Sequence, residues 1–167
     1  MKIGIASDHR GYPLKSELIK YLTKKNFEVI DFGTNSTNMV DYPEYAFKLG
    51  EAVVKKDIDF GIVTCGTGIG ISIACNKVKG VRCAKVDNVK EAELTRKDND
   101  ANVLALNGSM PLYRAKDIVD VFFKTNFTNV DRYVNRISQI IEYENNRNNN
   151  SFYGIRENRE YKSKYEQ

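Results

Sequence analysis

The chain has 167 residues, of which 41% are hydrophobic and 29% are charged, a composition typical of a single globular domain. The net charge is +4, and the tail 146–167 carries five Lys or Arg against three Glu, so the body lacks the basic surplus of a nucleic-acid-binding protein. Apolar runs stay far below the ~20 residues that span a bilayer. Residues 1–6 enter a strand without a signal core, so we expect a cytoplasmic protein with no membrane or nucleic-acid partner.

Short strand-like segments alternate with amphipathic helical segments up to about residue 145. In chain order the expected elements are strand 2–6, helix 12–25, strand 27–31, helix 43–56, strand 59–63, helix 68–77, strand 81–86, helix 88–97, strand 102–106, helix 111–124 and helix 128–145. The helical period is visible in Leu14, Leu18 and Leu22, which form one apolar stripe.

This alternation predicts the fold class α/β, as a three-layer Rossmann-like (flavodoxin-like) sandwich with a five-stranded parallel sheet plus a C-terminal helix. Ligands of such folds bind at the C-terminal ends of the strands. Residues 1–145 form the expected domain. The asparagine-rich run 145–150 has low complexity, which predicts that the polar extension 146–167 is flexible.

The turn after the third expected strand reads TCGTGIG and contains Cys65. Gly66, Gly68 and Gly70 leave backbone N–H groups unshielded just before a helix, which predicts an anion site. The same position raises the thiolate fraction of Cys65, a candidate base beside a pocket for an oxyanion. Alternatively, the turn needs glycine only to bend, and Cys65 is a small core residue. The spacing matches neither the dinucleotide fingerprint nor a P-loop, so nucleotide binding is disfavoured.

Two other turns carry polar side chains at expected strand ends. Asp8, His9 and Arg10 follow the first strand, which neighbours the third in this topology, so they should face its turn. A lone histidine there is otherwise a cap or a surface residue. Asp41 fits the N-cap of a helix whose first residue is a proline, and Tyr42 could form a pocket wall.

The remaining polar features are less specific. The dense polar run 95–102, ahead of the fifth strand, is typical of a solvated turn. Arg132 and Arg136 lie four residues apart on one helix face and suit a phosphate, although a solvent-facing pair has the same spacing. The three cysteines and the single histidine form no zinc-binding pattern, and a disulfide framework is not expected without an export signal.

Together these segments resemble the ribose-5-phosphate isomerase type B family, which includes the galactose-6-phosphate isomerase subunits. The matching stretches are SDHRGYPLK, EVIDFGTNS, VDYPEYA, GIVTCGTGIGISIACNKVKGVRCA, NDANVLALNG and the Arg132/Arg136 pair, and CGTGIGISIACNK is the most specific of them. The resemblance implies a homodimer, in some members a tetramer, with active sites shared between subunits and no metal or cofactor. It also implies interconversion of an aldose phosphate and its ketose, typically ribose 5-phosphate and ribulose 5-phosphate, through an enediolate.

Roles follow from the resemblance by matching position. It implies that Cys65 is the base at carbon 2, that Thr67 assists proton handling and that the amides from Gly66 to Gly70 hold the enediolate oxygen. The phosphate-binding positions correspond to His9, Arg132 and Arg136, and the positions that line the sugar correspond to Asp8, Asp41, Tyr42 and Asn99.

Two positions depart from the family pattern. Asp98 stands where many pentose-specific members have a histidine that opens the furanose ring, and Ser109 stands where many have a basic residue at the phosphate. An aspartate is ionised at neutral pH and does not readily return a proton to the ring oxygen, so ring opening would fall to Asp98 with Thr67 or Asp41, or to solution.

These departures leave three alternatives open. The substrate could be another sugar phosphate, either a hexose such as galactose or allose 6-phosphate, or a tetrose phosphate. The chain could also be a weakened partner subunit of such an enzyme. A receiver-like module is disfavoured, because it needs an acidic residue and a lysine where this chain has Thr64-Cys65 and Asn107-Gly108.

Overall fold

The computed structural model describes residues 1–147, and the expected flexible extension lies outside them except for its first two residues. The elements are β1 (Lys2–Ser7), α1 (Tyr12–Lys24), β2 (Glu28–Asp31), α2 (Tyr42–Val54), β3 (Phe60–Cys65), α3 (Ile69–Cys75), β4 (Cys83–Lys85), α4 (Val89–Asn99), β5 (Val103–Asn107), α5 (Leu112–Lys124) and α6 (Asp131–Asn146). Every predicted element is present, and most of the predicted boundaries shift by one to three residues. The fourth strand is shorter than predicted.

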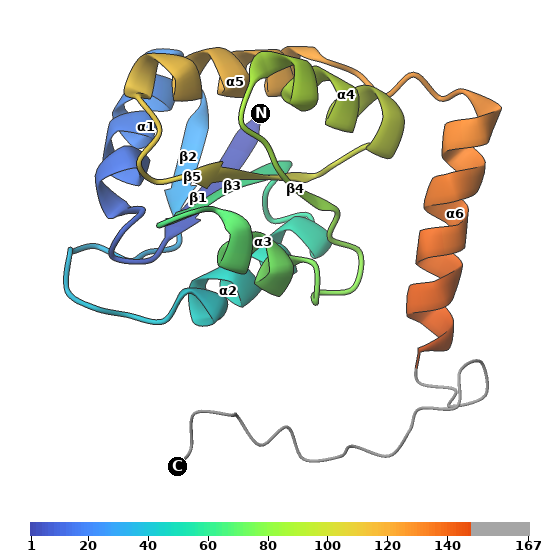
Figure 1. Ribbon diagram of the computed structural model, residues 1–167, viewed down its shortest axis with the longest axis horizontal. Coiled ribbons are helices and arrows are strands. Elements are labelled where there is room, and N and C mark those ends of the chain that lie inside the picture. Colours follow the sequence, from blue (N-terminus) through green and yellow to red (C-terminus); the bar gives the residue numbers. More distant parts are fainter. Residues whose placement is uncertain (148–167) are drawn as a thin grey trace.

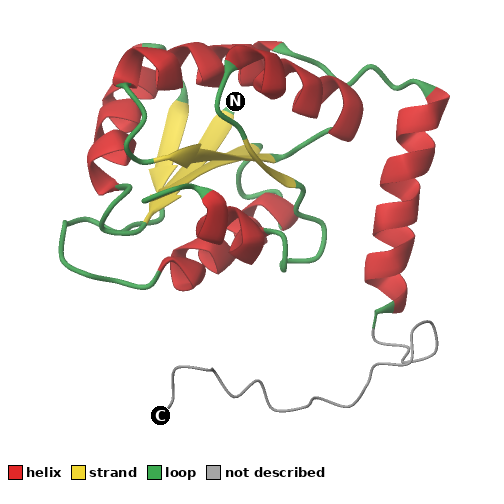
Figure 2. Ribbon diagram, viewed as in Figure 1, coloured by secondary structure: helices red, strands yellow, loops and turns green. Residues whose placement is uncertain are grey.

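The five strands form one parallel sheet in the order β2-β1-β3-β5-β4. Figure 2 shows these strands in yellow between two layers of helices. Helices α1, α4 and α5 cover one face, and α2 and α3 cover the other (Figure 1). The predicted three-layer sandwich is therefore confirmed, and so is the predicted pairing of the first and third strands. None of the helices within 1–147 is long and apolar enough to cross a membrane.

Each face of the sheet has its own apolar core. Ile5 and Ile62 pack with Leu18, Ile118 and other residues of the α1 and α5 side. The alternate strand residues pack against α2 and α3 on the opposite face. Because the strands are buried on both faces, polar chemistry is confined to the strand ends and the exposed helices.

The register of the central strands brings three turns together. Ser7 pairs with Thr64, and Cys65 pairs with Asn107. The chain therefore leaves β1, β3 and β5 at one edge of the sheet, and the three following turns lie side by side there.

Candidate active site

Cys65 is the last residue of β3, and its side chain is only 4% exposed. The Gly68 N–H donates a hydrogen bond to Cys65 Sγ across 3.2 Å. Gly68 has a φ of +76° and lies so close to β5 that a Cβ there would be 2.8 Å from the Leu106 carbonyl oxygen. The turn thus needs glycine at this position both for its backbone angle and for its fit, and this conformation aims an amide at the sulfur.

The other turn glycines leave room for neighbouring side chains. A Cβ on Gly70 would lie 2.7 Å from the Tyr42 ring, so Tyr42 packs against this turn. The amides of Gly66 and Thr67 have no hydrogen-bond partner among residues 1–147. Thr67 is exposed, and its Oγ1 accepts a hydrogen bond from Ile69 N at 3.2 Å. We call residues 64–70 the Cys65 turn.

The turn after β1 lies against the Cys65 turn, as predicted. The Asp8 N–H donates to the Thr64 carbonyl at 3.3 Å, and a Cβ on Gly11 would lie 2.3 Å from that same oxygen. The Asp8 carboxylate is 5% exposed, and its Oδ1 accepts from the amides of Arg10 and Gly11 at 2.9 and 2.8 Å. One Asp8 oxygen therefore fixes the turn, which leaves Oδ2 for a ligand.

His9 connects this turn to the loop before α2. Its Nδ1 lies 3.2 Å from both the N and the O of Val40. The contact occupies Nδ1 and leaves Nε2 as the ring nitrogen available to a ligand. The histidine is therefore more than the surface residue of the alternative interpretation, because it holds the loop that leads to Asp41 and Tyr42.

Asp41 occupies the predicted N-cap of α2, but its side chain makes no capping hydrogen bond. The helix begins at Tyr42, so Pro43 takes the second helical position rather than the predicted first. Asp41 is exposed. Its carboxylate is thus free of the structural role that the sequence suggested for it.

The turn after β5 completes this edge, and none of the predicted site residues lies on it. The Gly108 N–H donates to the Cys65 carbonyl at 2.8 Å, and Asn107 Oδ1 accepts from Ser109 N at 2.8 Å. Ser109 is exposed. The sequence feature that indicates this close contact is a glycine, Gly108, directly after a buried strand.

The prediction of a solvated turn at 95–102 is wrong for its first half, because α4 continues to Asn99. Thr95 and Arg96 are buried, and Arg96 Nη1 donates to Asp100 Oδ1 at 2.8 Å. Arg82 donates to the carbonyl oxygens of Asn99 and Asp100 at 3.0 and 3.2 Å. These two arginines, which the sequence reasoning missed, fix the helix end that carries Asp98 and Asn99.

Arg132 and Arg136 lie on α6 beside this helix end. Thr128 donates to the Lys97 carbonyl from both its amide and its hydroxyl, at 3.2 and 2.8 Å, and so fastens the α6 approach to α4. Both guanidinium groups lie over the Tyr133 ring, at 4.6 and 5.9 Å from its centre.

The pKa of Arg132 is raised, first by the Tyr133 hydroxyl that its Nη2 contacts and more weakly by the nearby Asp98 carboxylate. Arg132 therefore stays cationic and lies within electrostatic reach of Asp98.

The predicted site residues thus fall into two groups. Figure 1 shows α6 standing apart from the sheet, well away from the C-terminal ends of the strands. Within one chain, the residues of the α4–α6 corner (Asp98, Asn99, Arg132 and Arg136) are not brought to the Cys65 turn. A cavity of about 350 Å³ lies in this corner and is lined by Asn99 and Ile140, among others.

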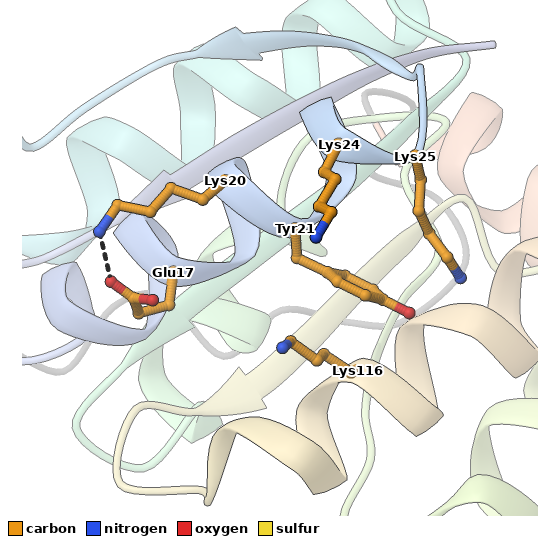
Figure 3. Close-up of a pocket in the computed structure, with 6 residues that line it drawn as sticks. All are labelled: Glu17, Lys20, Tyr21, Lys24, Lys25 and Lys116. Atoms are coloured by element: carbon orange, nitrogen blue, oxygen red, sulfur yellow. Dashed lines mark hydrogen bonds and ion pairs between the residues drawn. The ribbon is translucent and has the colours of Figure 1, made fainter.

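A separate groove of about 490 Å³ between α1 and α5 contains none of the predicted site residues. It is lined by Glu17, Lys20, Tyr21, Lys24, Lys25 and Lys116 (Figure 3). Two of its four ammonium groups are paired: Lys20 with Glu17, and Lys25 with Asp120, both at 2.6 Å. Because this groove contains none of the predicted site residues, the two groups above remain the candidate active site.

Comparisons with known proteins identify the family of the chain. The family model described as Ribose/Galactose Isomerase matches residues 3–140. The chain belongs to this family. Ribose-5-phosphate isomerase B of Escherichia coli is 40% identical over 148 residues, which is 88% of this chain and 99% of that protein. The predicted family is confirmed, and the chain is accordingly an aldose–ketose isomerase.

Solved structures of the family share the fold. Ribose-5-phosphate isomerase B of Clostridium thermocellum superposes with a TM-score of 0.86 and 49% identity, covering 88% of this chain and 99% of that one. The Mycoplasma genitalium enzyme, solved with bound ribulose-5-phosphate, has a TM-score of 0.81 and 43% identity, with coverage of 86% and 96%.

Proposed function

We propose that this enzyme interconverts ribose 5-phosphate and ribulose 5-phosphate through a cis-enediolate, with Cys65 as the base and without a metal or cofactor. The observation that carries the proposal is the hydrogen bond from Gly68 N to Cys65 Sγ, next to two amides without partners in residues 1–147. The substrate is that of the named relatives, including the Mycoplasma genitalium enzyme with its bound ketose phosphate.

In the forward direction the Cys65 thiolate takes the proton from carbon 2 of the open-chain aldose. The electron pair moves through the carbon 1–carbon 2 bond onto the carbonyl oxygen and forms the enediolate. The thiol then returns the proton to carbon 1, while a proton passes from the carbon 2 hydroxyl to oxygen 1 with the help of Thr67. Amides of the Cys65 turn stabilise the developing negative charge, which makes the weakly acidic carbon–hydrogen bond reactive.

A second copy of the chain supplies the rest of the site. We propose a homodimer in which Asn99, Arg132 and Arg136 of one protomer face the Cys65 turn of its partner and bind the sugar and its phosphate. Support comes from α6, which buries none of its side chains in its own chain and exposes Ile140 and Ile141 at 51% and 40%. On α3, next to the Cys65 turn, Ile69 and Ile73 are also exposed, at 53% and 56%.

The same arrangement brings Asp98 to the sugar. As a carboxylate it can take the anomeric hydroxyl proton but is a poor donor to the ring oxygen, so ring opening rests on Asp98 together with Thr67 or Asp41 of the opposite turn. With aspartate at this position, the enzyme should depend more on open-chain substrate than a family member that has histidine there. The proposed cytoplasmic location and the flexible extension 146–167 remain predictions.

The test is a panel of tetrose, pentose and hexose phosphates, assayed for aldose–ketose conversion after treatment with a chelator. We expect the highest kcat/KM with ribose 5-phosphate, and exchange of the carbon 2 hydrogen with heavy water during turnover. Preference for a hexose or tetrose phosphate would replace the substrate while retaining the mechanism. Inactivity with every member would identify the chain as a weakened partner subunit.

A further inference from the structure

Arg10 is a cation at the active-site edge to which the proposed mechanism gives no role. It follows His9 directly, and its side chain is exposed. The side chain lies over the Cys65 turn: a Cβ on Gly66 would be 3.0 Å from Arg10 Cδ and 3.7 Å from Nη1. Its guanidinium has no hydrogen bond or ion pair with any of residues 1–147. Within the described residues 1–147, Arg10 is therefore a cation without a partner, placed against the amides that surround Cys65.

The backbone of Arg10 is fixed on both sides, so this placement is built into the fold. Its N–H donates to Asp8 Oδ1 at 2.9 Å, and its carbonyl oxygen would lie 2.9 Å from a Cβ on Gly108. The turns after β1, β3 and β5 thus all meet at this residue. Ser109, the next residue on the third of these turns, is exposed and carries no charge.

His9 and Arg10 present a joint anion site at this edge. His9 Nδ1 is engaged by Val40, so Nε2 is the nitrogen that a ligand can reach. A guanidinium group offers two parallel N–H donors, which match the oxygens of a phosphate better than they match a single enediolate oxygen. A dianionic phosphate also offsets an unpaired cation more fully than a neutral sugar hydroxyl does.

We infer that Arg10 is a substrate-binding residue that contacts the phosphate group of the sugar phosphate beside His9, from the same protomer that provides Cys65. This inference rests on the proposed function and deepens it. The phosphate then lies between Arg10 of one protomer and Arg132 and Arg136 of the other. Arg10 acts in binding rather than in proton transfer, because the phosphate charge is the same in substrate, enediolate and product.

The experiment compares Arg10→Ala, Arg10→Lys and the wild-type full-length enzyme. We expect Arg10→Ala to raise KM for ribose 5-phosphate about 10- to 100-fold, the usual effect of losing a hydrogen bond to a charged group, with kcat changed less than about threefold. Arg10→Lys should keep part of the affinity that Arg10→Ala loses, because lysine retains the positive charge but lacks the two parallel N–H donors of the guanidinium group. Lys24→Ala, which removes an exposed cation from the α1–α5 groove, is the matched control and should leave KM unchanged.

A second measurement separates this inference from the choice of substrate. Inorganic phosphate binding is followed directly by calorimetry, so no turnover is needed. We expect Arg10→Ala to weaken phosphate binding by about the same factor as it raises KM, and Arg10→Ala/Ser109→Arg to regain part of it from the neighbouring turn. Unchanged phosphate affinity in Arg10→Ala, or a fall in kcat with KM unchanged, would overturn the assignment, whichever sugar the enzyme uses.

Discussion

The Cys65 turn and the α4–α6 corner are the two halves of the proposed active site, and they are built in opposite ways. The Cys65 side chain is nearly buried, and its turn is held by contacts between backbones, such as Gly68 against β5 and Gly108 against Cys65. The corner presents exposed side chains on a helix that has no fully buried side chain in its own protomer. In the proposed dimer, the residues for proton transfer are therefore preorganised within one chain, whereas the residues that hold the substrate come from the second copy.

The largest effect should come from the Cys65 turn itself. Cys65→Ala removes the proposed base, and we expect turnover to fall by roughly 10²–10⁴-fold, the usual contribution of a placed general base. Cys83→Ala is the control. A hydrogen bond with the Cys75 side chain, as the main cause, and burial, as the second, raise the pKa of Cys83 well above its ordinary value. This thiol therefore stays protonated at neutral pH. Near-wild-type turnover in Cys65→Ala would remove Cys65 from the mechanism.

A charge on the exposed face of α6 should separate the two protomers of the proposed dimer, and with them the two halves of each active site. Ile140→Glu places a carboxylate in the proposed interface, and we expect dissociation to monomers with a loss of activity of about 100-fold. Circular dichroism should remain that of the folded chain, because Ile140 is 51% exposed within its own protomer. Gln139→Glu, one residue away, is the control. A variant that stays dimeric by analytical ultracentrifugation would place the interface elsewhere.

The corner can be tested by mixing two damaged enzymes. Arg136→Ala alone should raise KM about 10- to 100-fold, since it removes a charge-assisted contact to the phosphate. If sites are shared, a hybrid of Cys65→Ala and Arg136→Ala protomers has one site with both changes and one intact site. Unfolding and refolding the two together should then restore about a quarter of wild-type activity, measured at low substrate. No recovery above the sum of the separate variants would mean that each protomer works alone.

The smallest effect concerns ring opening at the corner. Asp98→His supplies a group that can both take and give a proton near neutral pH, so we expect about a tenfold gain with ring-closed ribose 5-phosphate. A substrate that cannot close into a ring should gain nothing. Equal gains with both would show that Asp98 does not act on the ring.

The fold could be predicted almost completely from the sequence, because buried parallel strands and striped helices leave clear periodic signals. The Cys65 turn was also within reach: alternate glycines after a strand, ahead of a helix, describe a backbone that approaches its neighbours closely. The hydrogen bond from Gly68 N to the sulfur depends on a φ of +76°. Glycine permits this angle, but its presence in the sequence does not show that the angle is adopted.

The corner could not be predicted to the same extent. Residues 95–99 resemble a solvated loop in composition, yet Arg96 packs over the Phe60 ring at 4.8 Å and holds Asp100. Long side chains that bury their stems in this way defeat a prediction based on polarity. The separation of Arg132 from Cys65 was equally hidden, because sequence spacing does not tell whether two segments meet in one chain or across two.

The isolation of α6 also bears on how the enzyme behaves at low concentration. A helix of this length is marginal in water unless another surface covers it, and within residues 1–147 it is attached through contacts such as Thr128 at Lys97 and the Gly80 amide at Glu144. Diluting the protein should therefore fray this helix and scatter its arginines while the sheet and its sulfur remain in place. The specific activity would then fall as the protein is diluted and recover when it is concentrated again, so the activity of each molecule would depend on the protein concentration.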